Sequence, residues 1–164
     1  MEKDILEQLY YKYTRQVYLY LYSLCHNHTL AEDLMQETFL KAFCSMELSG
    51  TGVLPWLLTV ARNLYLDTWR REKRLTGQED IEITAGEEEV LSRMIQKERN
   101  QKLYQAILRL KDQEREAVVL YYFLGLSQEA ISRILGLSYG NTRVILYRAK
   151  QNLKKMLDEE EMRK

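Results

Sequence analysis

Apolar residues recur along much of the chain at steps of three and four positions, which is the spacing of one face of an α-helix. The first such stretch covers residues 3–25 and is rich in tyrosine. Its repeating positions are Leu6, Leu9, Tyr10, Tyr13, Val17, Tyr20, Leu21 and Leu24. Because a stripe of this kind most often packs into a core, the pattern predicts an N-terminal helix with one buried face.

Two more helices are predicted in the first half of the chain. Thr29 and Glu32 have the spacing of a capping box, in which each side chain satisfies a free backbone amide, so a helix should run over about 30–45. Ser, Gly and Thr residues at 49–52 then break the chain, and Pro55 suits the first turn of the next helix. The apolar pattern of that third helix continues through Trp56, Val60 and Leu64 and toward Trp69.

The pattern changes after residue 74, where polar and acidic residues show no clear apolar period. Such a stretch has little to bury, so 75–95 is predicted to be a flexible linker. Helical spacing is seen again from Val90 onward. Asp112 is placed to cap a further helix that ends near Gly125.

The composition agrees with a helical fold. The 164 residues include one proline and seven glycines, which is little punctuation for the many turns of an all-β protein. Leu, Glu, Lys, Arg and Gln are abundant instead, and these residues favour helices. We therefore predict an all-α protein with two small helical domains, 1–74 and 96–164, joined by the acidic linker.

Residues 126–150, LSQEAISRILGLSYGNTRVILYRAK, have the pattern of a helix-turn-helix. Gly136 falls on the turn position that needs a left-handed backbone, and Ser127 and Ser138 fall where N-caps belong. Ser132 occupies a position that must be small because the two helices approach closely there. The positions that pack the two helices together hold Ile131, Leu135, Leu137, Thr142 and Ile145. These matches predict that the C-terminal domain reads DNA.

The second helix of this motif has an inward and an outward face. The inward face holds Thr142, Ile145, Ala149 and Leu153, and the outward face holds Arg143, Val144, Tyr147 and Arg148. Arginine can bind a guanine edge through two hydrogen bonds, and tyrosine or valine can contact a thymine methyl. Lys150, Lys154 and Lys155 suit phosphates, which position a protein without specifying sequence. The alternative is a basic face that meets only solvent.

The chain has no formal net charge, with 24 Lys and Arg against 24 Asp and Glu, but the charges are segregated. Basic residues gather within 62–74 and again within 139–155, and acidic residues gather within 79–89. The local field decides where a phosphate backbone binds, so the two basic segments are candidate nucleic-acid contacts.

The basic segment at 56–74, WLLTVARNLYLDTWRREKR, also contains aromatic residues. Trp56, Tyr65 and Trp69 could stack on unpaired bases, Asn63 could read a base edge, and the cations could follow the backbone. In the alternative interpretation both tryptophans lie wholly in the core, and the charged side chains are solvent-exposed and bind no ligand. The segment by itself does not decide between the two.

The segment at 31–43, AEDLMQETFLKAF, is amphipathic. One side is predicted to pack inward and holds Ala31, Leu34, Met35, Thr38, Phe39 and Ala42. The other side holds Asp33, Gln36, Glu37 and Leu40 as neighbours three and four residues apart. An acidic patch beside an exposed leucine suits docking onto a basic helical partner, whereas a solvated acidic face is the simpler alternative.

Several classes of function are not supported by the sequence. The charged N-terminus indicates no signal peptide, no apolar run approaches the roughly 18 residues of a membrane span, and two cysteines suit a reducing cytoplasm. Cys25-His26-Asn27-His28 brings metal ligands together, but a helix end explains this stretch as well, and we predict neither metal nor cofactor. No catalytic pair or phosphate-binding glycine loop is present, so neither catalysis nor a small-molecule substrate is predicted.

Three segments, AEDLMQETFLKAF, PWLLTVARNLYLDTWRREKR and LSQEAISRILGLSYGNTRVILYRAK, resemble the signature segments of bacterial extracytoplasmic-function (ECF) sigma factors of the sigma-70 family. Their order and the acidic tether also match. The resemblance implies a cytoplasmic specificity subunit of RNA polymerase that directs promoter recognition, DNA melting and transcription initiation. It also implies an anti-sigma factor as partner, which could hold the protein at the membrane.

The resemblance assigns a role to each segment. In the family the acidic helix docks on the clamp coiled coil of the polymerase largest subunit, which carries over to Asp33, Gln36, Glu37 and Leu40. The next segment melts the minus-ten element and captures a base, which carries over to Trp56, Arg62, Asn63, Trp69, Arg70 and Arg71. The last helix reads the minus-thirty-five element of promoter DNA, which carries over to Asn141, Arg143, Val144, Tyr147, Arg148 and Lys150.

The chain departs from the family pattern at two places. The loop before Trp56 offers only Met46, Leu48 and Leu54 where family members often carry aromatic residues. Gly140-Asn141-Thr142 replaces the common Gly-Thr-Val, and Val144 replaces a small polar residue, so the minus-thirty-five preference cannot be transferred. The rival function is a dimeric operator-binding regulator, which explains 126–150 but not the other two segments.

Overall fold

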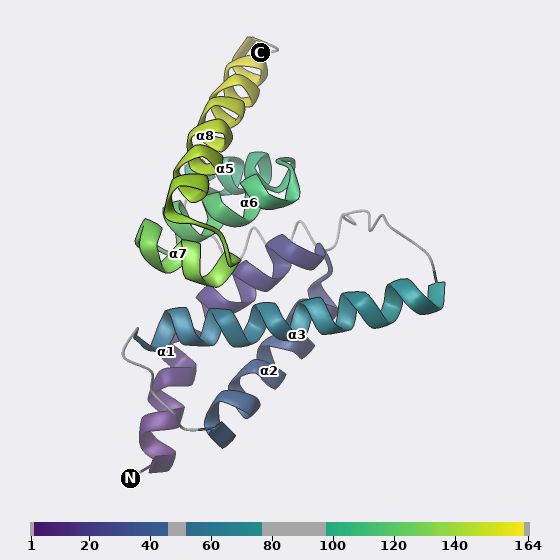
Figure 1. Ribbon diagram of the computed structural model, residues 1–164, viewed down its shortest axis with the longest axis vertical. Coiled ribbons are helices and arrows are strands. Elements are labelled where there is room, and N and C mark those ends of the chain that lie inside the picture. The colour runs from purple at the N-terminus through teal and green to yellow at the C-terminus, as the bar shows by residue number, and fades with distance from the viewer. Residues whose placement is uncertain (1, 46–51, 77–97, 163–164) are drawn as a thin grey trace. The chain divides into compact units, whose positions relative to one another are not determined.

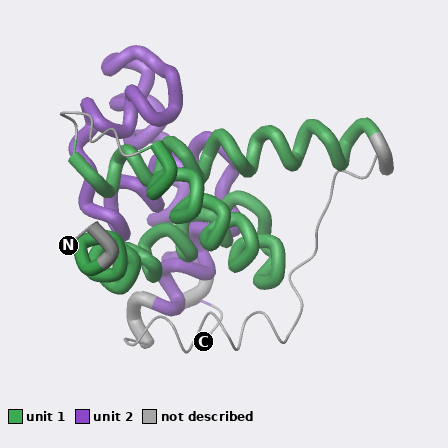
Figure 2. The backbone as a smooth tube through the Cα atoms, turned by 90° about the horizontal axis from the view of Figure 1, so that it is seen from below, with its two compact units in different colours: residues 1–87 green, residues 88–164 purple. Residues whose placement is uncertain are grey.

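A computed structural model of the protein describes residues 2–45, 52–76 and 98–162. The chain divides into two compact units, residues 1–87 and 88–164 (Figure 2). Every element in the described ranges is helical, which confirms the all-α prediction. The predicted linker at 75–95 lies almost entirely outside the described residues, as does the helical pattern that begins at Val90, and the domain limits stay a prediction.

The first unit is built from α1 (Glu2–Cys25), α2 (His28–Ser45) and α3 (Val53–Thr76), each of which packs on the other two (Figure 1). The predicted stripe of α1 faces this core, where its members Val17, Tyr20 and Leu21 are fully buried, and Tyr22, which the stripe did not include, is fully buried as well. The ring of Tyr10 meets that of Phe39 edge-on, with 5.0 Å between centroids. The predicted core role of the N-terminal stripe is therefore confirmed.

The turn between α1 and α2 differs from the prediction. The expected cap, Thr29, is exposed and lies inside the helix, whereas the Leu30 N–H donates to Asn27 Oδ1 at 3.0 Å. His26 adopts a left-handed conformation, with φ of 53°, directly after α1 ends. Because this residue turns the chain, Asn27 reaches the cap position and α2 begins two residues earlier than expected.

The start of α3 follows the sequence pattern. Gly52 has a φ of 95°, which suits glycine, and Pro55 lies in the first turn of the helix as predicted. Leu57, Leu58, Ala61 and Leu64 are buried, but none of the residues 65–74 is. The second half of α3 runs beyond α1 and α2 (Figure 1).

The second unit contains α5 (Glu98–Leu108), α6 (Asp112–Val118), η1 (Val119–Phe123), α7 (Gln128–Leu135) and α8 (Tyr139–Met162). The predicted cap residue of α6, Asp112, is instead its first helical residue, and no side chain caps the helix. Its carboxylate accepts a hydrogen bond at 2.8 Å from the buried Arg115, three residues further along the helix. The π-helical turn η1, which follows α6 directly, was not predicted.

The predicted helix-turn-helix is confirmed in α7 and α8. Ser127 Oγ accepts from the Ala130 N–H and Ser138 Oγ accepts from the Asn141 N–H, both at 3.1 Å. Gly136 ends α7 with φ of 67° and ψ of 33°, the left-handed conformation that favours glycine. These local interactions fix the start of α8 relative to α7.

Candidate nucleic-acid and protein interfaces

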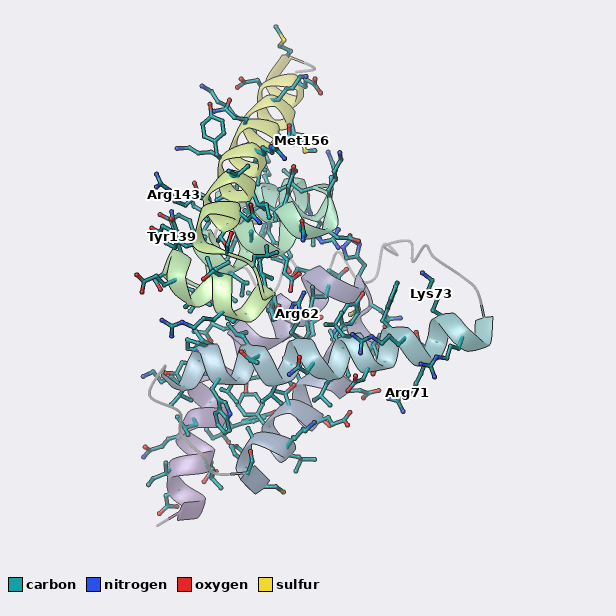
Figure 3. The ribbon with its side chains drawn as sticks, in the orientation of Figure 1. Arg62, Arg71, Lys73, Tyr139, Arg143 and Met156 are labelled. Carbon is teal, nitrogen blue, oxygen red and sulfur yellow. The ribbon has the colours of Figure 1, made fainter. Side chains whose placement is uncertain are left out.

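The outward face of α8 is exposed as predicted. Arg143, Val144, Tyr147 and Arg148 are all exposed, and so are Asn141 and Lys150. Figure 3 shows Arg143 projecting from the side of α8 that faces away from α5 and α6. The helix therefore presents two cations, a tyrosine ring and a branched apolar side chain on one surface.

The inward face of α8 holds that surface in place. Thr142 and Ala149 are fully buried, and Leu153 is buried as well. The Thr142 hydroxyl, which has no contact with solvent, donates to the Ser138 carbonyl at 2.9 Å. Ile145 is only half-buried, and Leu146, which the sequence prediction did not include, is buried. The helical period could have identified Leu146, because this residue lies one turn before Ala149 and two turns before Leu153.

On α3 the predicted contact residues are accessible to different degrees. Asn63, Arg70 and Arg71 are exposed, and Trp56 and Arg62 are half-buried. Trp69 is 43% exposed and Trp56 is only half-buried, so the interpretation in which both tryptophans lie wholly in the core is wrong. The segment can therefore offer an aromatic face, an amide and several cations to a ligand.

These α3 residues do not form one cluster: five of them follow two lines along the helix, and Arg71 lies on neither. Trp56, Asn63 and Arg70 are spaced by seven residues, which brings them to nearly the same side. Arg62 and Trp69 share a second line roughly 120° away. In Figure 3, Arg62 and Lys73 project from one side of α3 and Arg71 from the other. A single strand could contact one line or wrap across both.

Two local contacts limit what the end of α3 can do. The Lys73 ammonium lies over the Trp69 ring, 4.6 Å from its centroid, so a base stacking on this ring must use the other face or displace the lysine. Arg70 Nη1 lies 3.7 Å from Asp67 Oδ1, and both side chains are more than half exposed. Such an exposed pair is weak enough for a phosphate to replace.

The two faces of α2 agree with the sequence in full. The buried residues of this helix are Ala31, Leu34, Met35, Thr38, Phe39 and Ala42, the six predicted to face inward. Asp33, Gln36 and Glu37 are exposed, and Leu40, in line with them, is 65% exposed. A leucine this accessible beside two carboxylates forms a surface of mixed apolar and acidic character.

The possible metal ligands near the end of α1 have other partners. The Cys25 thiol donates to the Asn27 carbonyl at 3.3 Å, and His28 Nδ1 lies 2.6 Å from the Tyr18 hydroxyl. Within the described ranges there is no group of three or more His, Cys, Asp or Glu side chains that could hold a metal ion. None of the helices described here has the length and apolar character that crossing a membrane requires.

Family profiles match each of the two units, and known proteins match nearly the whole chain. A profile of sigma-70 region 2 matches residues 9–75, and a profile of sigma-70 region 4 matches residues 100–153. The ECF RNA polymerase sigma factor SigM of Bacillus subtilis is 35% identical over 91% of this chain and 93% of its own length. The RNA polymerase sigma factor YlaC of the same organism is 32% identical over 93% of this chain and 92% of its own.

A solved structure shows the same fold. The sigma factor RpoE of Bartonella quintana, in a co-crystal with the anti-sigma factor NepR, superposes with a TM-score of 0.76 and 27% sequence identity, covering 95% of this chain and 98% of that one. The chain therefore belongs to the ECF sigma factors of the sigma-70 family. It directs promoter recognition and transcription initiation, and the stand-alone operator-binding regulator is set aside.

Proposed function

We propose that this sigma factor divides its work among three helices. The α2 surface of Asp33, Gln36, Glu37 and Leu40 binds the clamp of the polymerase largest subunit. The exposed side of α3 opens the minus-ten element, and the outward face of α8 reads the minus-thirty-five element in promoter DNA. The domains that carry these tasks are residues 1–74 and 96–164, with 75–95 as tether.

The observation that carries the proposal is the exposed acidic and apolar surface on α2. It does not serve the core, because the inward face of the helix supplies every buried residue of this element. Burial of Leu40 against an apolar partner would remove its exposed surface from water, while Asp33 and Glu37 would meet basic side chains. The function of a DNA-binding regulator that acts alone does not call for such a surface, although a solvated acidic face is the simpler alternative.

The α3 residues are suited to separated strands. Trp69 retains an accessible ring, Asn63 an exposed amide, and Arg70 and Arg71 exposed cations. Stacking and phosphate contacts of this kind hold single strands without a sequence code, whereas the amide can select a base edge. In this proposal Trp56 and Asn63, which share one line of α3, capture an unpaired base, and the exposed cations hold the backbone.

The α8 residues are suited to intact duplex. A helix of this motif lies in the major groove with its outward residues against base edges. Arg143 and Arg148 bring hydrogen-bond donors, and Val144 and Tyr147 bring apolar surface for thymine methyls. Because each neutralised phosphate contributes to affinity and these helices can neutralise only a few, the chain should bind DNA weakly without the polymerase.

An anti-sigma factor is the further proposed partner. The related Bartonella quintana sigma factor is in complex with one, at 27% identity to this chain. In our proposal the antagonist covers the surfaces that polymerase and promoter need, and so keeps the protein inactive in the cytoplasm or at the membrane. The sigma factor itself contributes specificity and no catalysis.

The decisive experiment exchanges charge on α2. The double variant Asp33→Lys, Glu37→Lys should lose binding to purified core polymerase, because it sets like charges against the basic partner. The matched control is Asp4→Lys, Glu7→Lys, which makes the same charge change on the exposed surface of α1. Binding is measured by co-migration in size-exclusion chromatography, with far-ultraviolet circular dichroism to verify the fold.

The control variant should bind core polymerase as the unchanged protein does. If the α2 variant also binds normally and keeps its helical spectrum, the docking assignment is wrong. If both variants lose binding, the effect reflects net charge and not the α2 surface.

A further inference from the structure

Tyr139, which sequence reasoning did not place among the reading residues, is the first residue of α8 and is 49% exposed. In Figure 3 it projects from the same side of α8 as Arg143, away from α5 and α6. Its side chain forms no hydrogen bond or ring contact with another residue in the part of the chain that the structure describes. About half of its surface is therefore accessible to a ligand, and no described polar or ring contact competes for it.

The helical period aligns Tyr139 with two residues of the proposed reading face. Tyr139, Arg143 and Tyr147 follow one another in steps of four, so their side chains lie along one line of the helix surface. The neighbouring line holds Gly140, Val144 and Arg148, where the glycine contributes no side chain. Between Arg143 and the start of α8, Tyr139 is therefore the one residue on these two lines that has a large side chain.

The position of Tyr139 lengthens the surface that can meet bases. From Arg143 to Arg148 the helix rises by roughly 7.5 Å, and Tyr139 adds about 6 Å more. One base pair occupies about 3.4 Å along the duplex. If α8 follows the groove, the ring reaches one to two base pairs past those that Arg143 contacts.

We infer that Tyr139 is a specificity-determining residue that contacts the methyl group of a thymine at the end of the minus-thirty-five element nearest the start of α8. This inference rests on the proposed reading role of α8. An aromatic ring packs well against a methyl carbon, and residues near the start of a recognition helix contact base edges. The tyrosine hydroxyl can still meet water or a phosphate oxygen at the groove edge.

The test uses full-length protein with core polymerase on templates whose upstream promoter element is randomised, followed by sequencing of the templates that yield transcript. The unchanged protein is compared with Tyr139→Ala, Tyr139→Phe and Arg143→Ala. The matched control is Tyr122→Ala on η1, since Tyr122 is 48% exposed in the same unit but lies on another element.

We expect Tyr139→Ala to lose a thymine preference of about fivefold or more at one base pair, next to the position that Arg143→Ala affects. Tyr139→Phe should keep this preference, and Tyr122→Ala should leave every position unchanged. Replacing that thymine by uracil removes only the methyl group. It should reduce transcription by the unchanged protein about fivefold and leave Tyr139→Ala unaffected.

Other outcomes overturn the inference. A uniform loss across all sequences would make Tyr139 a backbone contact, and equal transcription from thymine and uracil templates would exclude the methyl. A changed preference in Tyr122→Ala would show that the effect is not local to α8. If the unchanged protein starts no transcript with core polymerase on any template, the proposed function fails first.

Discussion

The two helices that carry the candidate DNA contacts, α8 and α3, are anchored differently in their units. On α8 the buried residues Thr142, Leu146 and Ala149 alternate with the outward residues, so each exposed side chain has a buried neighbour within one turn. Among residues 53–74 of α3 the last buried one is Leu64, and Arg70 follows about 9 Å further along the helix axis.

This difference separates two kinds of contact. A hydrogen bond to a base edge forms well only when the donor side chain is held in position. The anchored part of α8 holds its outward side chains in this way. A phosphate backbone tolerates movement, because the attraction depends on charge more than on direction. We therefore expect α8 to supply specificity and the end of α3 to supply affinity that depends on salt.

The largest expected effect tests the anchoring itself. Leu58→Ala, at a fully buried position of α3, should lower the free energy of unfolding of the first unit by about 2–5 kcal/mol. Leu66→Ala, on the same helix beyond Leu64, should cost about 1 kcal/mol or less. Both tryptophans of the chain lie on α3, so urea unfolding followed by tryptophan fluorescence reports this unit alone. Equal losses would mean that the second half of α3 is packed.

The next effect concerns the anchored reader. Arg148→Ala should cost about 1–3 kcal/mol of discrimination at one base position, because a bidentate contact to a base is lost. The measurement is competition between promoter templates that differ at single positions, in the presence of core polymerase. A loss of the same size on every template would make Arg148 a phosphate contact.

A smaller and different effect is expected at the end of α3. Arg71→Ala should weaken promoter binding on all sequences alike and lower the slope of log affinity against log salt by about 0.7 to 0.9, the contribution of one neutralised phosphate. Arg15→Ala removes an exposed arginine from α1 and serves as the control. If Arg71→Ala alters base preference instead, the assignment of specificity to α8 and of salt-dependent affinity to the end of α3 is wrong.

The smallest expected effect is that of Gly140→Ala, which should raise stability and lower transcription. Gly140 lies in the first turn of α8, its φ is not positive, and a Cβ built there would meet no heavy atom within 4 Å. Gly140→Ala should therefore stabilise the fold by about 0.5 kcal/mol, as thermal unfolding would measure. If DNA approaches this turn closely, the same change should reduce transcription. Unchanged transcription would mean that the start of α8 stands clear of the groove.

The sequence predicted those features that depend on local spacing. All six inward residues of α2, the left-handed turn at Gly136 and the caps at Ser127 and Ser138 follow from helical period and short-range hydrogen bonding. The outward face of α8 follows from the same rules. Each of these features needs only neighbours within a few residues, and such neighbours are visible in the chain itself.

The missed features depend on contacts that spacing does not reveal. Thr29 satisfied the capping pattern, yet the left-handed turn at His26 moved the cap to Asn27. The exposure of Trp69 and the lysine over its ring depend on where the core of the first unit ends. The helical period also places five of the predicted α3 residues on two lines and Arg71 on neither, which a list of residue types does not reveal.

The separation of faces on α8 has a consequence for how such regulators diverge. Thr142, Leu146, Ala149 and Leu153 maintain the helix-turn-helix, and the exposed residues Arg143, Val144, Tyr147 and Arg148 point outward without sharing that task. A duplicated copy can therefore exchange its outward residues one at a time and acquire a new set of target genes while its architecture stays intact. In this way one scaffold can give rise to many separate regulatory circuits within a single genome.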